Sequence, residues 1–495
     1  MDTLNYQSLN RSGYDGFILK DAPEKVLQFG EGNFLRAFTD HFIDVMNETA
    51  GFNGKVVVVK PRSGGRVGNV INEQEGLYTL LLRGVNDGRK QEIKRVISCI
   101  SRCINPYTDH KGFLECAHNP ELRFIVSNTT EAGITFDPGC SLTDEPPAGF
   151  PAKLTRFLYE RYNSGLPGFI ILPCELIDRN GDVLRECVEE YISLWKLPAD
   201  FSAWVRDENI FCSTLVDRIV PGYPKAEAGA LCESFGYSDG LLDSAEVFGS
   251  WVIEGPGFVS DEFPADRASL PVTFVSNVDP YKKRKVRILN GAHTSMALGA
   301  YLAGKDIVRD CMEDDVISGY LMAAVNDEII PVLSDLDEKE VKDFAAAVRD
   351  RFLNPFMDHE LLSIALNSTA KWKARVMPTL IEYHAAKGTL PKMLTFSFAA
   401  YLSFYHSGYE MEDGALKGLR GSDTFLIKDD EYVLEEFLSL KDADDDTLAE
   451  AIIGNEKMWG SALKDIAGFK EAVTGYLKLI ADKGMYEAMR LIRQE

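Results

Sequence analysis

The 495-residue sequence lacks a long hydrophobic run, although 45% of its residues are hydrophobic. No stretch approaches the roughly 18 consecutive apolar residues that predict a membrane-spanning helix. The opening stretch, MDTLNYQSLNRSGYDG, lacks the basic and then apolar pattern of a secretion signal. We therefore expect a cytoplasmic protein without a membrane partner.

Cysteine and positive charge are also scarce. The nine cysteines form no CxxC pair, and the closest two, Cys99 and Cys103, have no histidine nearby. This pattern predicts reduced thiols and no metal site. With 53 Lys and Arg against 76 Asp and Glu, the net charge is −23, which argues against nucleic acid as a partner. An anionic substrate would need local cations around it.

The length favours two or three domains, and the first half alternates short apolar runs with helical stretches. The runs are rich in β-branched or aromatic residues, and turn residues follow them; they are Lys25–Phe29, Lys55–Val59, Glu121–Ser127 and Gly168–Pro173, with Ile210–Thr214 as a further candidate. Nearly continuous hydrophobicity is typical of strands buried on both faces of a parallel sheet. Residues 1–280 are therefore predicted to form an α/β domain of the doubly wound, Rossmann type.

From about Val286 the strand-like runs disappear and helical patterns dominate, as in EKEVKDFAAAVRDRFL and GFKEAVTGYLKLIADKG. The aspartates of DADDDTLAEAIIG are good N-caps for a helix. Residues 281–495 are predicted to form a mainly α-helical domain.

The stretch VLQFGEGNFLRAF, Val26–Phe38, places Gly30 and Gly32 between a strand and an amphipathic segment. In a dinucleotide-binding turn the first glycine allows the tight turn and the second lets the backbone approach the pyrophosphate. The usual third glycine position holds Leu35. A cofactor site made by Phe29, Gly30, Gly32, Asn33 and Phe34 and an ordinary glycine turn both remain open.

The second strand is followed by Lys60 and Arg62, where an acid that binds the adenosine ribose is expected. These cations would either accommodate the 2′-phosphate of NADP or face solvent.

The stretch KVRILNGAHTS contains Lys285, Asn290 and His293. At about 100° per residue, Asn290 lies roughly 140° from Lys285 and His293 falls between them, so all three can face one cleft. Carbonyl reduction needs a proton donor and a group that polarises the carbonyl. The alternative is a solvated lysine beside a capping asparagine and a structural histidine.

The motifs Gly30–Arg36, Val126–Ile134, Ser213–Gly222 and KVRILNGAHT occur in the order found in the mannitol dehydrogenase family of zinc-independent polyol dehydrogenases. The resemblance covers nearly the whole chain, and QFGEGNFLRAF, VVVVKP, PCELIDRNG and WVIEG are most similar to its uronate branch. It implies a Rossmann-type domain, a helical domain and an active site between them. The resemblance favours NAD(H) over NADP(H), because the uronate branch commonly carries a basic residue after the second strand and still uses NAD.

The resemblance also assigns roles to residues. Lys285 matches the catalytic acid and base, Asn290 the amide that holds the substrate oxygen, and His293 the group that orients the reacting hydroxyl. Thr130 and Glu131 match positions beside the nicotinamide half of the cofactor.

Asp217 matches an aspartate near the substrate, with an ion pair to Arg218 as its alternative role. A second asparagine of the mannitol-active members is replaced by Leu176, which follows Glu175, so no role is assigned to that position.

A sugar acid would need a cation for its carboxylate. Lys371 and Arg375 are four residues apart and share a helix face, and Lys371 matches a pocket lysine of the family. The alternative is a solvated basic face. His359, His384 and His406 are expected in helices, with structural or exposed roles.

The expected activity is NADH-dependent reduction of a keto-uronate to an aldonate, with tagaturonate and altronate as the specific pair. Fructuronate reduction and neutral polyol oxidation are alternatives within the family. A non-catalytic nucleotide-sensing module is the alternative of another class. The oligomeric state is left open.

Overall fold

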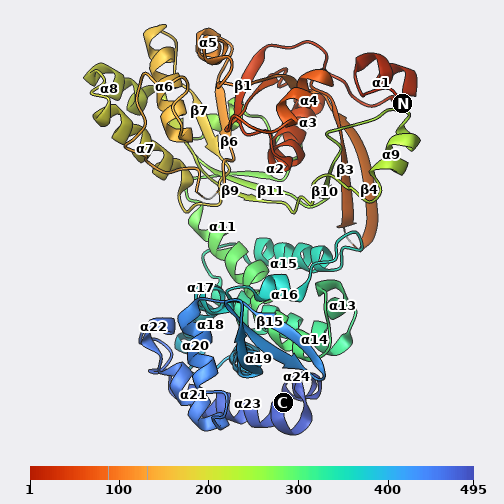
Figure 1. The fold of residues 1–495 in the computed structure, drawn as a ribbon, viewed down its shortest axis with the longest axis vertical. Helices are drawn as coiled ribbons and strands as arrows, with labels where there is room; N and C mark the ends of the chain where they lie inside the picture. Colours follow the sequence, from red (N-terminus) through yellow and green to blue (C-terminus); the bar gives the residue numbers. More distant parts are fainter. Residues whose placement is uncertain (87, 131, 495) are drawn as a thin grey trace. The chain divides into compact units, whose positions relative to one another are not determined.

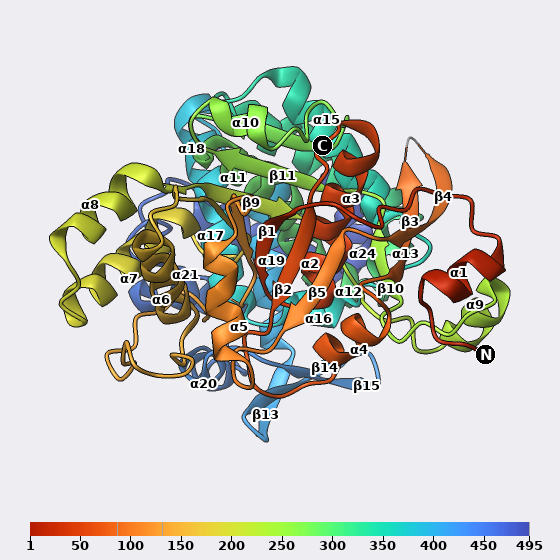
Figure 2. The same cartoon turned by 90° about the horizontal axis from the view of Figure 1, so that it is seen from above.

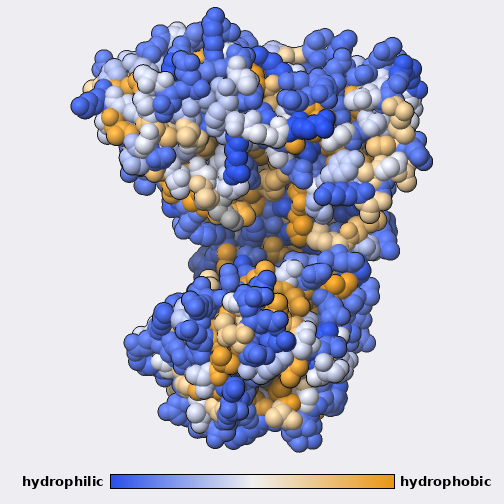
Figure 3. Space-filling model, viewed as in Figure 1, coloured by the Kyte–Doolittle hydropathy of each residue, from blue (hydrophilic) through white to orange (hydrophobic). Residues whose placement is uncertain are grey.

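The computed structural model describes residues 1–86, 88–130 and 132–494. They form two compact units: Met1–Gly84 with Lys90–Val278, and Val85–Arg89 with Asp279–Glu495. Figure 1 shows the elements of each unit coloured along the sequence. None of the described helices is long and apolar enough to cross a membrane, and polar residues cover much of the face of each unit in Figure 3.

The first unit is built on a six-stranded parallel sheet with the order β5-β2-β1-β6-β7-β8. Its strands are β1 (Glu24–Phe29), β2 (Lys55–Val59), β5 (Ile100–Ile104), β6 (Phe124–Ser127), β7 (Ile170–Pro173) and β8 (Ile210–Phe211). Counted within this sheet the order is 3-2-1-4-5-6, which is that of a Rossmann fold. The predicted doubly wound α/β fold is confirmed, and Figure 2 shows β1, β2 and β5 side by side.

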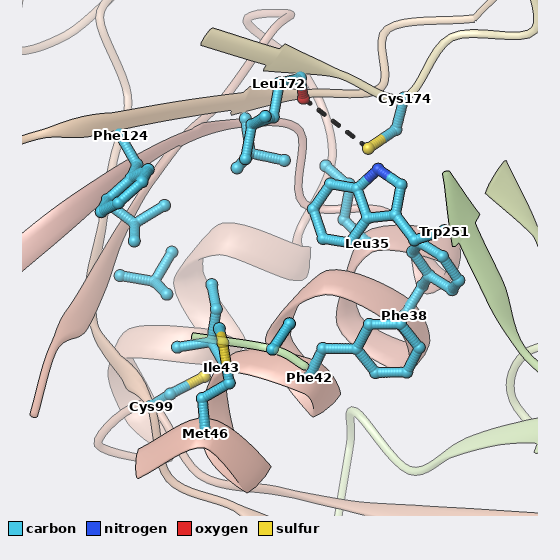
Figure 4. Close-up of a cluster of buried hydrophobic side chains, with 14 of the residues drawn as sticks. Leu35, Phe38, Phe42, Ile43, Met46, Cys99, Phe124, Leu172, Cys174 and Trp251 are labelled. Atoms are coloured by element: carbon cyan, nitrogen blue, oxygen red, sulfur yellow. Dashed lines mark hydrogen bonds between the residues drawn. The ribbon is translucent and has the colours of Figure 1, made fainter. Parts of the chain in front are cut away.

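Two apolar layers sandwich the sheet because its strands are buried on both faces. One layer holds Phe38, Phe42 and Trp251, whose rings pack 4.7–6.3 Å apart (Figure 4). The other includes Phe157 of α6 and Val188 of α7. The helices of the unit are α1 (Tyr6–Ser12), α2 (Asn33–Leu35), α3 (His41–Thr49), α4 (Val67–Glu73), α5 (His110–Glu115), α6 (Phe150–Asn163), α7 (Asn180–Leu194), α8 (Ala199–Glu208), α9 (Ala228–Phe235) and α10 (Phe258–Glu262).

Two smaller sheets complete the first unit. One has the order β10-β3-β4 and the other β12-β11-β9. Their strands are β3 (Tyr78–Asn86), β4 (Arg89–Ile97), β9 (Ser213–Asp217), β10 (Asp243–Glu246), β11 (Ser250–Glu254) and β12 (Val272–Val275). The single strand expected at Ile210–Thr214 was wrong. That stretch is divided between β8, which pairs with β7, and β9, which pairs with β11.

The second unit is mainly helical, as predicted. Its helices are α11 (Asp279–Arg284), α12 (Gly291–Leu302), α13 (Val308–Met312), α14 (Asp315–Ala323), α15 (Glu338–Phe352), α16 (Leu361–Ala365), α17 (Ser368–Arg375), α18 (Met377–Lys387), α19 (Lys392–His406), α20 (Glu431–Ser439), α21 (Asp445–Ile453), α22 (Glu456–Trp459), α23 (Phe469–Lys483) and α24 (Met485–Ile492). Asp444 caps α21 by accepting a 2.8 Å hydrogen bond from the Thr447 amide.

The expectation that strands are absent from this unit was wrong. An antiparallel sheet is formed by β13 (Gly408–Glu412), β14 (Ala415–Arg420) and β15 (Asp423–Ile427). Asp413 and Gly414 connect the first two strands with φ angles of 48° and 76°. Asp-Gly favours such a two-residue hairpin turn, so this sequence signal was present but was outweighed by the surrounding helical patterns.

Three helical segments are π-helical: η1 (Arg36–Asp40), η3 (Lys285–Asn290) and η4 (Ala324–Ile329). Short 3₁₀ turns lie at η2 (Cys116–His118) and η5 (Ile330–Val332). Single π turns within helices are rare overall, and those that occur are often found at functional sites. Here η1 follows the glycine turn, and η3 carries Lys285 and Asn290.

Candidate functional site

The glycine turn leaves the carboxyl end of β1, between the ends of β2 and β6. The Gly30 amide donates a 3.1 Å hydrogen bond to the Val59 carbonyl, and its φ is +135°. A Cβ at this position would lie 2.9 Å from Leu35 Cδ1 and 3.2 Å from the Asn128 carbonyl oxygen. Only glycine fits this conformation without strain.

Gly32 has a different environment. It precedes α2 with extended φ and ψ of −72° and 165°, and a Cβ there would meet no atom within 4 Å. From Asn33 the chain continues through α2, η1 and α3 to Thr49. An open backbone at the start of this helical run fits the pyrophosphate of a dinucleotide, because helix-initial amides point toward the anion.

The other residues predicted around the turn differ in burial and in their contacts. Phe29 is fully buried, and its ring packs 5.0 Å from that of Phe150, so its side chain belongs to the core and only its backbone borders the turn. The Asn33 side chain is exposed at the turn and accepts a 2.6 Å hydrogen bond from Arg36 Nη2. Phe34 stacks on Phe38, with 5.1 Å between ring centroids.

Arg36 connects this turn to a buried polar cluster. Its guanidinium is 3% exposed, donates to the Leu241 carbonyl and lies 3.4 Å from the Asp243 carboxylate. Burial raises the pKa of Asp243 to about 7, and it raises the pKa of Asp40 to about 7 as well. The turn therefore packs on a buried polar network that contains the carboxyl groups of Asp40 and Asp243.

The loop after β6 is held by Glu175. This carboxylate is 2% exposed and accepts hydrogen bonds from the Ser127 hydroxyl at 3.0 Å, the Thr129 amide at 2.9 Å and the Thr129 hydroxyl at 3.0 Å. The next residue, Thr130, is exposed with φ +82°. Glu131 lies outside the described residues. Leu176, which follows Glu175, is 62% exposed, whereas Glu175 is buried.

Lys60 and Arg62, which follow β2, differ in their exposure to solvent. Lys60 is 3% exposed, and its Nζ donates a 2.9 Å hydrogen bond to the Gly65 carbonyl. Arg62 is exposed on the loop.

In the second unit, Lys285 and Asn290 begin and end the π-helical turn η3. Hydrogen bonds in a π-helix join residues five apart, so Asn290 follows Lys285 by one hydrogen-bonded π turn. The sequence prediction assumed α-helical spacing, which placed the two residues roughly 140° apart. The observed turn is wider than that spacing.

His293 follows one turn later, in α12, and is buried. Its ring stacks on Phe352 with 4.0 Å between centroids and meets the His359 ring edge-on at 5.1 Å. Burial lowers the pKa of His293 well below its usual value, and the charges of His359, Arg351 and Arg375 add to this effect. The lowered pKa favours the neutral imidazole, and its buried Nε2 has no hydrogen-bond partner among the described residues.

Arg375 and Lys371, both half-buried, lie one turn apart on α17. Arg375 donates a 3.4 Å hydrogen bond to the Thr294 hydroxyl, beside His293. Lys371 Nζ donates to the Ile364 carbonyl at 2.9 Å. Burial lowers the pKa of both groups, and for Lys371 the neighbouring Arg375 charge adds to the effect.

Gly291 makes this arrangement possible. A Cβ at Gly291 would lie 3.2 Å from the Arg375 carbonyl oxygen, which is tighter than ordinary van der Waals contact. The glycine after Asn290 therefore lets the end of α17 approach the start of α12.

His359 was expected in a helix, and this placement was wrong. It lies between α15 and α16 rather than in a helix, and its backbone carbonyl accepts a 3.0 Å hydrogen bond from the Val308 amide. Burial lowers the pKa of His359, and the charge of Lys371 contributes. No local pattern marks this histidine; only the packing of α12 places it beside His293.

Asp217 ends β9 in the first unit, opposite Ser250 of β11, and is 8% exposed. The adjacent Arg218 donates to the carbonyls of Phe248 and Ala37 and contacts His41 Nδ1 at 3.2 Å.

Two family models match the sequence: the mannitol dehydrogenase Rossmann domain over residues 24–266 and the mannitol dehydrogenase C-terminal domain over residues 277–481. This chain belongs to the mannitol dehydrogenase family. Both halves of the family pattern are present, so the resemblance predicted from four ordered motifs is confirmed.

Similar proteins include the altronate oxidoreductase of Escherichia coli O139:H28, which is 44% identical over 98% of this chain and 99% of its own length. The protein of the same name from E. coli O17:K52:H18 has the same identity and coverage.

Two solved dehydrogenase structures share the fold. Pseudomonas fluorescens mannitol 2-dehydrogenase, in complex with NAD and D-mannitol, has a TM-score of 0.69 at 22% identity and covers 100% of both chains. D-Sorbitol dehydrogenase in substrate-free form has a TM-score of 0.80 at 21% identity and covers 99% of this chain and 100% of its own.

Proposed function

We propose that this protein catalyses the reversible, NADH-dependent reduction of a keto-uronate to an aldonate, with D-tagaturonate and D-altronate as the substrate pair. The relatives named altronate oxidoreductase, similar along nearly the whole chain, support this activity. The main support is the arrangement of residues in the second unit. Lys285, Asn290 and His293 follow each other on one helical run, and burial lowers the pKa of His293. The cations Lys371 and Arg375 lie on α17, whose end contacts Thr294, the residue after His293.

The proposed cofactor is NAD(H). The strand order of the sheet, the open backbone at Gly32 and the positive φ at Gly30 suit a dinucleotide. When bound, the nicotinamide supplies or accepts the hydride. Asn33 and Phe34 border the helix start, and the loop containing Thr130 is fixed by Glu175.

In the proposed chemistry, Lys285 Nζ donates a proton to the substrate oxygen in reduction and removes it in oxidation. The Asn290 amide hydrogen-bonds that oxygen and stabilises the charge that develops on it. His293 orients the reacting group through Nε2. A neutral imidazole is suited to this, because it accepts at one nitrogen and donates at the other.

The substrate carboxylate is assigned to Lys371 and Arg375. These are concentrated cations in a chain of net charge −23, as an anionic substrate requires. An arginine guanidinium matches the geometry of a carboxylate with two parallel donors. The role of Asp217, a buried carboxylate in the first unit, is proposed as a substrate contact by family resemblance.

The test is the loss of NADH absorbance with purified protein and tagaturonate, fructuronate or fructose, with NADPH in parallel. Rapid oxidation of NADH with tagaturonate alone is expected. Preference for fructuronate or fructose would retain the chemistry and change the substrate. Activity with NADPH alone would contradict the cofactor assignment, and inactivity with every pair would favour a nucleotide-sensing module.

A further inference from the structure

The expected carboxylate is missing after β2, but a carboxylate from another part of the chain lies beside that loop. In a Rossmann fold that binds NAD, an acid at the end of the second strand accepts a hydrogen bond from the adenosine ribose. Here Lys60 occupies that position. Glu31, between the two glycines of the turn after β1, extends its side chain toward the loop that follows β2.

The surroundings of the Glu31 carboxylate show where it lies. Its Oε2 lies 4.0 Å from Cys103 Sγ of β5, and the Gly68 backbone amide donates a hydrogen bond to it. A Cβ at Gly68 would lie 2.8 Å from Oε2, and a Cβ at Gly65 would lie 3.5 Å from Oε1. The carboxylate therefore lies near the carboxyl ends of β2 and β5, although it comes from the turn after β1.

Lys60 is engaged inside the same loop. Its Nζ donates to the Gly65 carbonyl at 2.9 Å, and its charge lowers the pKa of Glu31 against the larger effect of burial, which raises it. Glycines at 65 and 68 leave room for the carboxylate between loop and helix. Lys60 thus donates within the loop, and the Glu31 carboxylate lies beside the same loop.

We propose that Glu31 is the residue that determines cofactor specificity: it accepts a hydrogen bond from the adenosine ribose 2′-hydroxyl and repels a 2′-phosphate. This inference rests on the proposed use of a nicotinamide dinucleotide. It explains how a chain with two basic residues after β2 selects NAD(H), because the acid reaches the ribose position from the glycine turn.

The test compares the binding of NADH and NADPH, each titrated against wild type and the variants Glu31→Gln and Glu73→Gln by calorimetry, without substrate. Glutamine keeps the shape of the side chain and an acceptor for the Gly68 amide, so loop structure is preserved. Glu73 is exposed at the far end of α4, and its replacement removes the same charge from the same region.

We expect the ratio of the NADPH and NADH dissociation constants to fall by at least tenfold in Glu31→Gln and to stay at the wild-type value in Glu73→Gln. An unchanged ratio in Glu31→Gln, with normal NADH binding by wild type, would overturn the inference and leave the proposed function intact. A wild type that prefers NADPH would also overturn it. Wild type that binds neither dinucleotide would contradict the proposed function itself.

Discussion

The guanidinium of Arg375 donates to the hydroxyl of Thr294, the residue directly after His293. This bond joins the end of α17 to α12 and places a cation beside the neutral imidazole. Together with Lys371, one turn earlier, it creates a positive region in a strongly acidic protein. The cations proposed to bind the substrate carboxylate therefore lie in the same unit as the proposed catalytic residues.

Replacing Arg375 or Lys371 by alanine should weaken keto-uronate binding selectively. A lost charge-assisted contact to a carboxylate costs about 1.5–3 kcal/mol, so KM for tagaturonate should rise roughly 10- to 100-fold. Steady-state kinetics with tagaturonate and with neutral fructose measures the difference. Lys373→Ala is the matched control, because residue 373 lies on another face of α17. Equal losses with both substrates would mean that the cations do not recognise the carboxylate.

Lys285→Ala should remove the proton donor without affecting the cofactor. General acid catalysis contributes typically 10²- to 10⁴-fold, so kcat should fall by at least about 10²-fold while the Kd for NADH is unchanged. Turnover and NADH fluorescence titration provide the two readouts. The neighbouring Lys283→Ala serves as control, since Lys283 pairs with Asp335 at 3.2 Å. Wild-type turnover in Lys285→Ala would exclude this lysine from the mechanism.

Gly32→Ala should impair the cofactor and spare the fold. Its φ of −72° is open to any L-residue, and the new methyl group would meet no protein atom within 4 Å. The group would instead occupy the space assigned to the pyrophosphate. We expect unchanged thermal stability and a Kd for NADH at least tenfold higher. Gly229→Ala, also in open space but on α9, should change neither quantity.

Glu175→Ala should loosen the loop after β6. The substitution leaves the Thr129 amide and the Ser127 hydroxyl without their acceptor, and an unsatisfied buried donor costs about 1–3 kcal/mol. Both Tm and NADH affinity should fall. Glu175→Gln keeps one acceptor oxygen and should lie between alanine and wild type. A stable Glu175→Ala protein with normal NADH binding would contradict this role.

The buried carboxyl of Asp40 should make stability depend on pH. Burial raises its pKa from 3.8 to about 7, so the folded state holds a proton that the unfolded state releases. This contribution is fully present below pH 3.8 and is lost as the pH rises through about 7. Between pH 6 and 8 the loss amounts to about 1.4 kcal/mol.

Asp40→Asn should therefore lose less stability than wild type over this interval. Calorimetric Tm values at pH 6 and pH 8 measure the effect, with exposed Asp15→Asn as control. An identical fall in Asp40→Asn and wild type would show that Asp40 does not hold the proton. Asp243 and Glu328, whose pKa values burial also raises to about 7, should preserve part of the dependence in the variant.

Features that depend on neighbours within a few residues were readable from the sequence. Apolar runs such as KVVVV gave β2 with its observed bounds, because a strand buried on both faces needs continuous hydrophobicity. The glycine turn at Gly30 and the order of the family motifs were equally local, and so was the spacing of Lys285, Asn290 and His293. Together they predicted the Rossmann-type fold, the helical second half and the family.

Features that depend on contacts between distant segments were decided only by the tertiary structure. Lys285 and Asn290 lie in a π turn and not in an α-helical one, the packing of α12 placed His359 beside His293, and the Glu31 carboxylate lies near Gly65 and Gly68 after β2. Sequence periodicity reports which face of an element is apolar, not which distant residue meets it. A carboxylate from the turn after one strand can therefore lie beside the loop that follows another strand.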